Sequence, residues 1–428
     1  MAKKVIIISY YWPPAGGPGV QRWLKFVKYL RDFDIDPIVY VPENPSYPII
    51  DETFSNDIPK DITILKQSIF EPYAFAKVFS KKKTKTISKG IIAKEKQTLI
   101  EKLLLYIRGN FFIPDARKYW VKPSVKFLKK YIAEHHIETI ITTGPPHSLH
   151  LIGLQLRKQL PVKWIADFRD PWTTIGYHEE LKLTKKSQQK HYELEAEVLQ
   201  TADQIVTTSF TTRKEFLQLT KQPIEVITNG YDVEKYAKTT LDEKFTISHI
   251  GSLLSARNPE VLWEVLSELI QTNETFATDF QLQFAGVVSQ RIQRKIITFG
   301  LQSYTTYFGY VSHQKALELQ RTSQVLLLIE INAEKTKGII AGKLFEYMAA
   351  ERPIIGIGPK DADISKIIQE TNTGTYFLYT EKEQLKAQIL SYYEAFKKQQ
   401  LYTSPIGLQQ YSRKALTGKL AELLHNLA

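Results

Sequence analysis

The sequence contains no cysteine and no long apolar run, and each absence excludes a class of protein. Without cysteine among its 428 residues, the chain has no disulfide scaffold, no thiolate zinc site and no cysteine nucleophile. No window reaches the roughly 18 uncharged apolar residues that span a bilayer. The opening residues, MAKKVIII, also lack the apolar core and the small-residue cleavage site of a secretory signal. We therefore expect a cytoplasmic protein.

Basic residues, in contrast, are in excess. The chain has 57 Lys and Arg against 45 Asp and Glu, which gives a formal net charge of +12. This balance indicates attraction to an anionic partner such as nucleic acid, a nucleotide or an acidic membrane surface. Because the basic residues are spread through the chain and no nucleic-acid-binding motif accompanies them, we expect no nucleic-acid partner.

Short runs rich in Val and Ile alternate with helical patterns along the chain. Most runs show little polar alternation, which is typical of parallel strands buried on both faces by crossover helices. A first set covers residues 5–8, 37–41, 137–142, 162–166, 204–207 and 224–227, and a second covers 245–250, 281–285, 306–308, 325–329 and 354–357. The sequence therefore predicts an α/β fold with two Rossmann-like, doubly wound parallel-sheet domains. We place them at residues 1–235 and 240–408, followed by an amphipathic segment at 409–428.

A long insert at residues 71–120 interrupts this rhythm in the first domain. It contains the run KKKTK at 81–85, a helical apolar pattern at 91–107 and the aromatic-rich NFFIPDARKYW. A solvated lysine loop followed by surface helices is one interpretation. The other is a patch that attaches the protein to the inner face of the plasma membrane, because Leu99, Leu103, Leu104 and Ile107 form an apolar helical face beside basic residues.

Glycines and a histidine follow two predicted strands of the first domain, at the sheet edge where ligands bind in open α/β sheets. In SYYWPPAGGPGVQRW, Gly16 and Gly17 allow a close backbone approach to a ligand, although their spacing is not that of the GxGxxG fingerprint. A tight strand-to-helix connection is the alternative. In TTGPPHSLHLIG, His147 lies near a helix start, where it either faces a ligand or serves in capping and packing.

A third loop, DFRDPW, places three charges in four residues directly after a buried strand. Asp167, Arg169 and Asp170 need either a ligand or one another at that position. Ion pairs of Arg169 with the two carboxylates are the alternative to a catalytic role.

The second domain carries an anion-site pattern in HIGSLLSARNPEVLW. The backbone at Gly251 and the hydroxyl of Ser252 can donate to phosphate oxygens, Arg257 adds charge, and a helix begins near Pro259. A surface-exposed Arg257 is the alternative.

Further along, TKGIIAGKLFEYMAAERPIIGIGP sets a lysine and a glutamate one turn apart on a new helix. A carboxylate there can accept both ribose hydroxyls, while the lysine and the preceding backbone amides face phosphates. A plain surface Lys–Glu pair is the alternative. The residues expected to contact a nucleotide here are Gly338, Ile339, Lys343, Leu344 and Glu346.

That last segment resembles the donor-binding segment of family 4-type glycosyltransferases with the GT-B fold, in which two Rossmann-like domains face each other across a cleft. The resemblance extends to the loops described above, to TNGYD at the domain junction, and to a last helix that in such proteins returns to the first domain. It implies transfer of a hexosyl group from a nucleotide-diphosphate sugar, held by the second domain, to a glycan or lipid-linked acceptor, held by the first. Surface polysaccharide or glycoconjugate biosynthesis is the implied pathway.

Two departures from the family pattern affect the donor site. Glu346 corresponds to the second glutamate of the E-x7-E motif and would hold the ribose, but Gly338 takes the place of the first, so the sugar's identity does not carry over. The sequence RNPE also replaces the family's lysine-glycine dipeptide. By this comparison, Arg257 is the main phosphate ligand and Lys343 a weaker candidate.

The resemblance further implies a retaining mechanism without a metal or other cofactor. The departing phosphate then takes the acceptor's proton, and His147 hydrogen-bonds the sugar or the acceptor. In an inverting enzyme, a carboxylate such as Asp167 or Asp170 would act as base instead. A GT-B-fold nucleotide-sugar epimerase is the alternative function; it would form an epimer reversibly without any acceptor.

Overall fold

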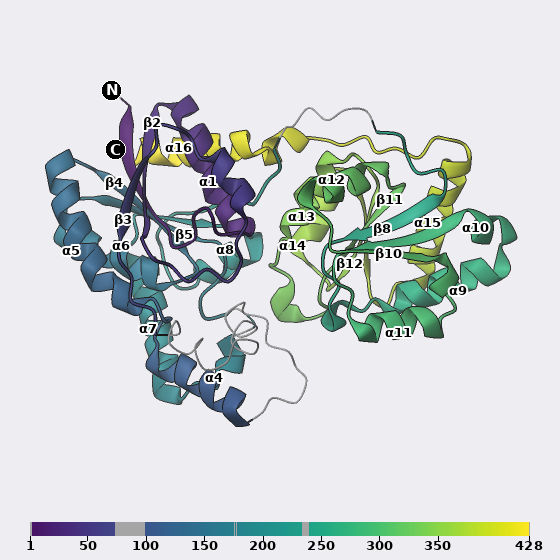
Figure 1. The fold of residues 1–428 in the computed structure, drawn as a ribbon, viewed down its shortest axis with the longest axis horizontal. Helices are drawn as coiled ribbons and strands as arrows, with labels where there is room; N and C mark the ends of the chain where they lie inside the picture. The colour runs from purple at the N-terminus through teal and green to yellow at the C-terminus, as the bar shows by residue number, and fades with distance from the viewer. Residues whose placement is uncertain (1, 73–98, 175, 177, 233–238, 428) are drawn as a thin grey trace. The chain divides into compact units, whose positions relative to one another are not determined.

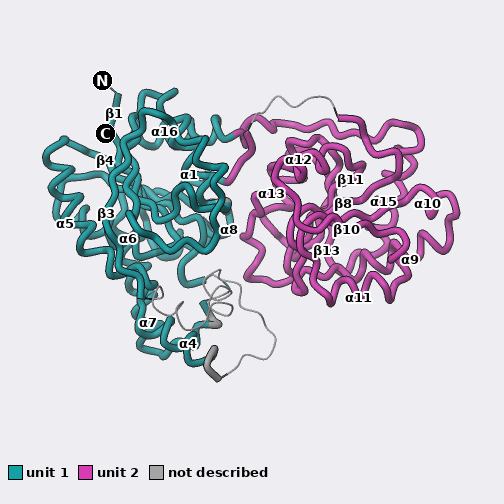
Figure 2. Tube along the Cα trace, viewed as in Figure 1, with its two compact units in different colours: residues 1–228, 413–428 teal, residues 229–412 magenta. Residues whose placement is uncertain are grey.

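The computed structural model describes residues 2–72, 99–174, 176, 178–232 and 239–427 (Figure 1). The chain divides into two compact units (Figure 2), which are described separately below. Unit 1 comprises residues 1–228 and 413–428, and unit 2 comprises 229–412. The first unit thus ends at residue 228, a few residues before the boundary expected from the sequence, and it includes the C-terminal helix.

Unit 1 is built on a seven-stranded parallel sheet in the order β3-β2-β1-β4-β5-β6-β7. Its strands are β1 (Lys3–Ile8), β2 (Ile35–Pro42), β3 (Thr63–Gln67), β4 (Thr139–Gly144), β5 (Lys163–Phe168), β6 (Gln204–Thr207) and β7 (Ile224–Val226). Strand β3 is absent from the sequence prediction. Its sequence, TILKQ, is short and half-exposed at the sheet edge, so it lacks the apolar run by which the buried strands are recognised.

Helices cover both faces of this sheet, because successive side chains of a strand point to opposite sides. On one face, Ile6 and Ile8 of β1 pack against α5 (Lys118–His135), α6 (Ser148–Gln159), α7 (Lys185–Thr201) and α8 (Phe210–Phe216). On the other, Val5 and Ile7 pack with α1 (Pro18–Leu30) and α16 (Arg413–Asn426), which lie side by side in Figure 1. A further helix, α4 (Leu99–Phe111), precedes α5.

Unit 2 repeats the plan with a six-stranded parallel sheet in the order β10-β9-β8-β11-β12-β13. Its strands are β8 (Phe245–Ile250), β9 (Phe280–Ala285), β10 (Thr305–Gly309), β11 (Val325–Ile329), β12 (Ile354–Gly358) and β13 (Gly374–Leu378). One face carries α9 (Glu260–Thr272), α10 (Glu274–Asp279), α11 (Gln290–Thr298) and α15 (Lys382–Lys397); the other carries α12 (His313–Thr322), α13 (Gly342–Ala349) and α14 (Asp363–Glu370) (Figure 1).

The strand orders show where each sheet can bind a ligand. In both units the first strand is central, with β1 between β2 and β4, and β8 between β9 and β11. The chain reverses its direction of winding there, and loops at the carboxyl ends of these strands form the usual binding site of an open α/β sheet. The predicted fold class, two doubly wound parallel-sheet α/β domains, is therefore confirmed. No helix in the described parts of the chain has the length and apolarity needed to cross a membrane.

Candidate functional site

The loop after β8 is held close to its neighbour by two glycines. Gly251 has φ of 120° and donates its N–H to the carbonyl of Ala285 at 2.7 Å. Gly286, with φ of 114°, packs so tightly that a Cβ there would lie 2.7 Å from the Gly251 backbone. Ser252 follows with its side chain exposed. The loop therefore presents a fixed backbone and an exposed hydroxyl at the carboxyl end of β8.

A buried carboxylate at the end of β11 lies beside this loop. Glu330 is 1% exposed, and its Oε2 lies 3.6 Å from Nη2 of Arg257, which the short turn before α9 positions. Within the described residues, neither carboxylate oxygen of Glu330 has a hydrogen-bond partner, and the Nε of Arg257 has none either. Burial raises the pKa of Glu330, whereas Arg257 and Lys343 act to lower it. The two charges thus form a loose ion pair that an anionic ligand can reorganise.

Lys343, in the first turn of α13, adds a second cation. Its Nζ lies 3.2 Å from Nε2 of His249, whose Nδ1 lies 2.9 Å from the carbonyl of Leu327. Because a carbonyl only accepts, Nδ1 carries the proton and Nε2 accepts from the lysine. Burial and the lysine charge hold the pKa of His249 well below its usual value. Burial lowers the pKa of Lys343 to about 8, with Glu330 and Glu346 opposing the shift and Arg257 adding to it.

Glu346 lies one turn further along α13. Its Oε2 accepts a hydrogen bond of 3.1 Å from Nε2 of Gln320 on α12, and Gln320 is itself buried with its Oε1 unpartnered among the described residues. The hydroxyl of Tyr347 accepts from the N–H of Ile250 at 2.8 Å, which ties α13 to β8. The buried side-chain amide of Gln320 on α12 therefore orients the carboxylate of Glu346, and Tyr347 anchors α13, which carries Glu346, to the central strand β8.

The remaining three predicted residues of this segment have different surroundings. Gly338 is half-buried, and Ile339 is 42% exposed with its N–H bonded to the carbonyl of Thr336. Leu344 is fully buried in the core, and its N–H is bonded to the carbonyl of Ala341. Leu344 thus packs α13 into the core, and its expected contact with a nucleotide stays a prediction.

The glycines of the first-domain loop are packed closely against other parts of unit 1. Gly17 caps α1 with φ of 114°, and Gly16 donates its N–H to the carbonyl of Ile49 at 3.0 Å, where a Cβ would meet the Ile49 side chain at 2.9 Å. A Cβ on Gly19 would overlap the guanidinium of Arg169. These observations favour the alternative drawn from the sequence, a tight strand-to-helix connection.

Asp167 is saturated by protein donors. It is 1% exposed and accepts from Nη2 of Arg22 at 3.1 Å, from Nε1 of Trp23 at 2.9 Å and from Oγ1 of Thr143 at 2.8 Å. Arg22, also buried, was not singled out in the sequence. The carboxylate joins α1 to β4 and β5, which favours an anchoring role for Asp167, and its expected catalytic role stays a prediction.

The two other charges of that loop have surroundings of their own. Arg169 donates to the carbonyl of Pro145, and its guanidinium lies 6.0 Å from the centre of the Tyr11 ring. The side chain of Asp170 is exposed overall, yet burial of its carboxyl group raises its pKa, with Arg169 opposing the shift and Asp167 adding to it. Among the described residues Asp167 pairs with Arg22, and no ion pair joins Arg169 to either carboxylate.

His147 is a buried imidazole without hydrogen-bond partners. It is 5% exposed, directly precedes α6 and stacks on Trp172 with ring centres 5.0 Å apart. Neither ring nitrogen has a partner among the described residues. Burial, with smaller contributions from His150 and Arg169, keeps the pKa of His147 well below its usual value. A neutral ring with one free donor and one free acceptor is costly to bury unless a ligand completes it.

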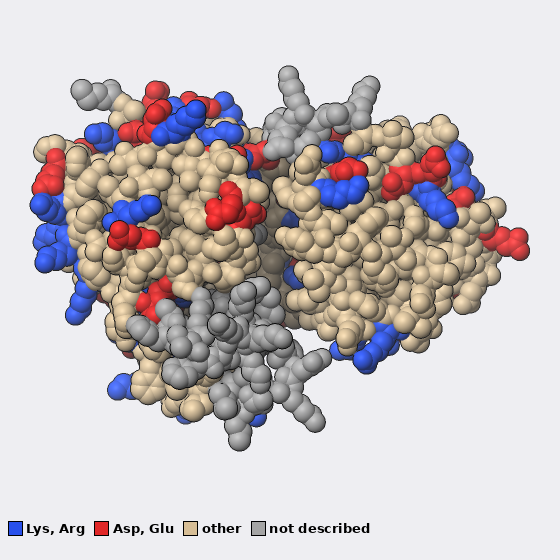
Figure 3. Space-filling model, in the orientation of Figure 1, with Lys and Arg blue, Asp and Glu red and all other residues tan. Residues whose placement is uncertain are grey.

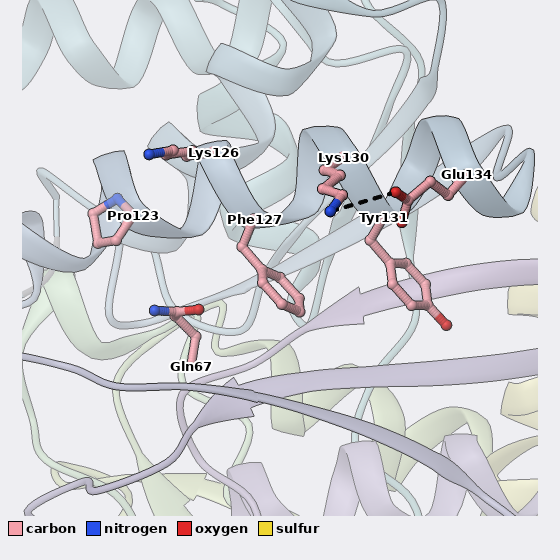
Figure 4. Close-up of a pocket in the computed structure, with 7 residues that line it drawn as sticks. All are labelled: Gln67, Pro123, Lys126, Phe127, Lys130, Tyr131 and Glu134. Atoms are coloured by element: carbon pink, nitrogen blue, oxygen red, sulfur yellow. Dashed lines mark ion pairs between the residues drawn. The ribbon is translucent and has the colours of Figure 1, made fainter.

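One surface groove lies outside these loops. It has a volume of about 440 Å³ and runs between the edge strand β3 and the outer face of α5 (Figure 4). Its lining residues are Gln67, Pro123, Lys126, Phe127, Lys130, Tyr131 and Glu134. Lys130 and Glu134 form an ion pair of 3.6 Å across one turn. None of the residues predicted from the sequence lines this groove. In the described parts of the chain, no group of three or more metal-ligating side chains is arranged to hold an ion.

Comparisons with known proteins agree with this architecture. Residues 91–235 match the sequence profile of the family described as Glycosyltransferase Family 4. A search of curated protein sequences gave no match. One similar solved structure is a sucrose-phosphate synthase from Thermosynechococcus elongatus, with 14% identity over 99% of each chain and a TM-score of 0.60. A mutant of TarM from S. aureus, in complex with Fondaparinux, alpha-GlcNAc-glycerol and UDP, is 13% identical over 99% of each chain, with a TM-score of 0.58. A putative UDP-N-acetylglucosamine 2-epimerase from Listeria monocytogenes is 12% identical over 100% of this chain and 96% of that one, with a TM-score of 0.56.

Proposed function

We propose that this chain is a family 4-like glycosyltransferase and that it transfers a sugar from a nucleotide-diphosphate sugar to a glycan or lipid-linked acceptor, as the family match over residues 91–235 and the GT-B fold support. The observation that carries the proposal is the gathering of Arg257, Lys343 and Glu346 beside the carboxyl ends of β8 and β11. Two cations suit a diphosphate, and a carboxylate one helical turn away suits the ribose hydroxyls.

The charge balance of the cluster supports a diphosphate as ligand. Glu330 accepts no hydrogen bond from the described residues and lies 3.6 Å from Arg257, so an incoming phosphate competes with a single loose ion pair for the guanidinium. Fixed cations that face the bridging oxygen stabilise the diphosphate as it leaves, which is the electrostatic contribution that this reaction needs most. On this basis we propose that the transfer needs no metal ion or other cofactor.

Unit 1 supports a retaining route for the acceptor side. Asp167 already accepts three hydrogen bonds, so it is unsuited to take a proton from an acceptor hydroxyl. We propose that the departing phosphate takes that proton. His147, whose ring nitrogens have no partner among the described residues, would hydrogen-bond the sugar or the acceptor. Asp170, which is exposed, remains the carboxylate through which an inverting route would run.

The surface of unit 1 supports a membrane-bound acceptor. Figure 3 shows Lys and Arg gathered over α5, where the exposed lysines are Lys122, Lys126, Lys129 and Lys130. Next to the start of this helix, Lys118 lies over the rings of Phe112 and Tyr119, and Leu103 and Phe111 of α4 are 57% and 63% exposed. Exposed apolar and basic side chains together are typical of helices that rest on an anionic bilayer. The lysine run at 81–85 lies outside the described residues.

This surface leads to a proposed location and pathway. We propose a protein of the cytoplasm that associates peripherally with the inner face of the plasma membrane and acts in surface polysaccharide or glycoconjugate biosynthesis. Support comes from the basic, partly apolar surface of unit 1 and from the family resemblance.

A turnover assay tests the proposed reaction. Purified protein is incubated with UDP-, GDP- and ADP-sugars, with and without a lipid-linked glycan fraction, and the released nucleoside diphosphate is measured. We expect release that depends on the acceptor, with the donor's anomeric configuration kept in the product as read by NMR. Reversible formation of an epimer without acceptor would identify an epimerase, and inverted configuration would contradict the retaining route.

A further inference from the structure

The proposed donor site holds a lysine–histidine pair that the sequence motifs did not indicate. We propose that His249 positions the ammonium group of Lys343 against the donor's diphosphate, so that this pair supplies the second cation which the RNPE sequence lacks. This inference rests on the proposed function, because it names how the same site holds its phosphates. His249 is a positioning residue, since it acts through Lys343.

Neighbouring strands fix the histidine ring. His249 is the second-last residue of β8 and is fully buried, and its Nδ1–H donates to the carbonyl of Leu327 on the adjacent strand β11. This bond sets the tautomer, so Nε2 presents a lone pair at the carboxyl edge of the sheet. A rigid acceptor at this point removes the freedom that a lysine side chain otherwise keeps.

The position of the lysine nitrogen suits a phosphate held by the β8 loop. Nζ of Lys343 lies 3.2 Å from Nε2 of His249 and 3.6 Å from the point where a Cβ on Gly251 would be. The missing side chain at Gly251 therefore leaves the ammonium open toward the loop backbone. A diphosphate seated there would meet backbone N–H groups and the ammonium together.

The charges facing Lys343 are balanced before a ligand binds. Glu330 follows β11, Glu346 lies on the same helix, Arg257 comes from the turn before α9, and His249 is neutral. Two cations face two carboxylates, and one of these carboxylates, Glu330, accepts no hydrogen bond from the part of the chain that the structure describes. An incoming diphosphate makes the cluster strongly anionic, so its affinity depends on both cations being charged.

A pH dependence follows from this arrangement. Burial lowers the pKa of Lys343 to about 8, so the ammonium is charged below that pH and becomes a neutral amine above it. His249 cannot replace the lost charge, because burial keeps its own pKa far lower. Diphosphate affinity is therefore highest below pH 8 and declines as the pH rises through this value, whereas a lysine with its ordinary pKa near 10.4 would leave it unchanged.

The first experiment compares two substitutions of the lysine. The ligand is whichever of UDP, GDP and ADP binds best, with its nucleoside for comparison. The Kd of each is measured by titration calorimetry from pH 7.5 to 9.5, a range above the phosphate's own pKa near 6. We expect the wild-type Kd for the diphosphate to rise roughly tenfold over this range. Lys343→Arg, which stays charged, should bind with no such rise. Lys343→Met should bind roughly ten- to hundredfold more weakly at pH 7.5, with nucleoside affinity unchanged.

The second experiment separates positioning from structure. His249→Phe keeps a ring in the buried strand but offers no hydrogen-bond acceptor to Lys343. We therefore expect weaker diphosphate binding, and we expect the loss of affinity with rising pH to begin at a lower pH than in the wild type. His249→Gln restores an acceptor and should return the decline toward pH 8. Lys398→Met, an exposed change at the end of α15, serves as a control that should behave as wild type.

The possible failures are distinguishable. Three results would each overturn the inference while leaving the donor site intact. In the first, diphosphate affinity still falls with pH in Lys343→Arg; in the second, wild-type affinity does not change with pH. In the third, His249→Phe has the same pH profile as the wild type. If none of the three nucleoside diphosphates binds the wild-type protein, the proposed function fails first and this inference with it.

Discussion

At the scale of single residues, a charge that follows a buried strand can have either of two roles. Asp167 and Glu330 both come at the carboxyl end of a central strand and are both 1% exposed. Asp167 accepts three hydrogen bonds, whereas neither oxygen of Glu330 accepts one from the described residues. The first therefore holds the fold together, and the second lies in the site that we propose binds the donor.

Asp167→Asn should destabilise the protein more than it alters chemistry. The amide leaves Arg22 buried without its counter-charge and directs a donor at other donors, so we expect a loss of about 3 to 5 kcal/mol in the free energy of unfolding, measured with urea. Asp61→Asn is the matched control, because this side chain is exposed, and it should change stability by less than about 0.5 kcal/mol. A stable Asp167→Asn protein without turnover would restore Asp167 as a catalytic base.

At the scale of elements, the interior strands and two of the four edge strands, β7 and β10, could be predicted, and the other two edge strands could not. Strand β11 is wholly apolar and β1 ends in four consecutive apolar residues, so their composition identifies them, whereas β8, FTISHI, contains three polar residues although it is buried throughout. The edge strands β3 and β13 are short and half-exposed, and neither was predicted. The predicted strand ends did indicate the loops with Gly251, Arg257 and Lys343. They could not indicate His249 or Gln320, because a buried histidine in a strand and a glutamine on a helix acquire their roles only through tertiary contacts.

Gly286→Ala tests whether close packing of two loops holds the phosphate-binding backbone. The substitution forces a side chain into φ of 114° and within 2.7 Å of the Gly251 backbone, so we expect a loss of about 1 to 3 kcal/mol in stability together with weaker diphosphate binding. Gly300→Ala is the comparison, since it also has a positive φ but open space around its Cα. Equal losses of stability and unchanged binding in both variants would contradict the packing argument.

At the scale of the whole molecule, the chain combines two parallel-sheet units with a C-terminal helix that belongs to the first. Leu416, Leu420 and Leu424 of α16 join the core formed by α1 and β1. Arg413 also donates to the side chain of Gln21 at 3.0 Å. Part of the net charge of +12 comes from the exposed lysines of α5, which make one surface of unit 1 basic.

Charge reversal on α5 tests the proposed membrane surface. Each lysine near an anionic leaflet contributes about 1 kcal/mol, so changing Lys122, Lys126, Lys129 and Lys130 to glutamate should release the protein from phosphatidylserine-containing vesicles in a flotation assay at low salt. The same change at four exposed lysines of unit 2, Lys244, Lys366, Lys397 and Lys398, should leave vesicle binding intact. Wild-type protein that ignores such vesicles would favour a soluble acceptor.

The central claim is that unit 2 binds a nucleoside diphosphate through Arg257 and Glu346. Its most direct test is a calorimetric titration of UDP, GDP and ADP, with the matching nucleosides, into wild type, Arg257→Ala and Glu346→Ala at pH 7.5. We predict that one diphosphate binds the wild type, that Arg257→Ala weakens the diphosphate and spares its nucleoside, and that Glu346→Ala weakens both by about 1.5 to 3 kcal/mol, or roughly ten- to hundredfold. Binding that neither substitution alters, or no binding of any diphosphate to the wild type, would contradict the claim.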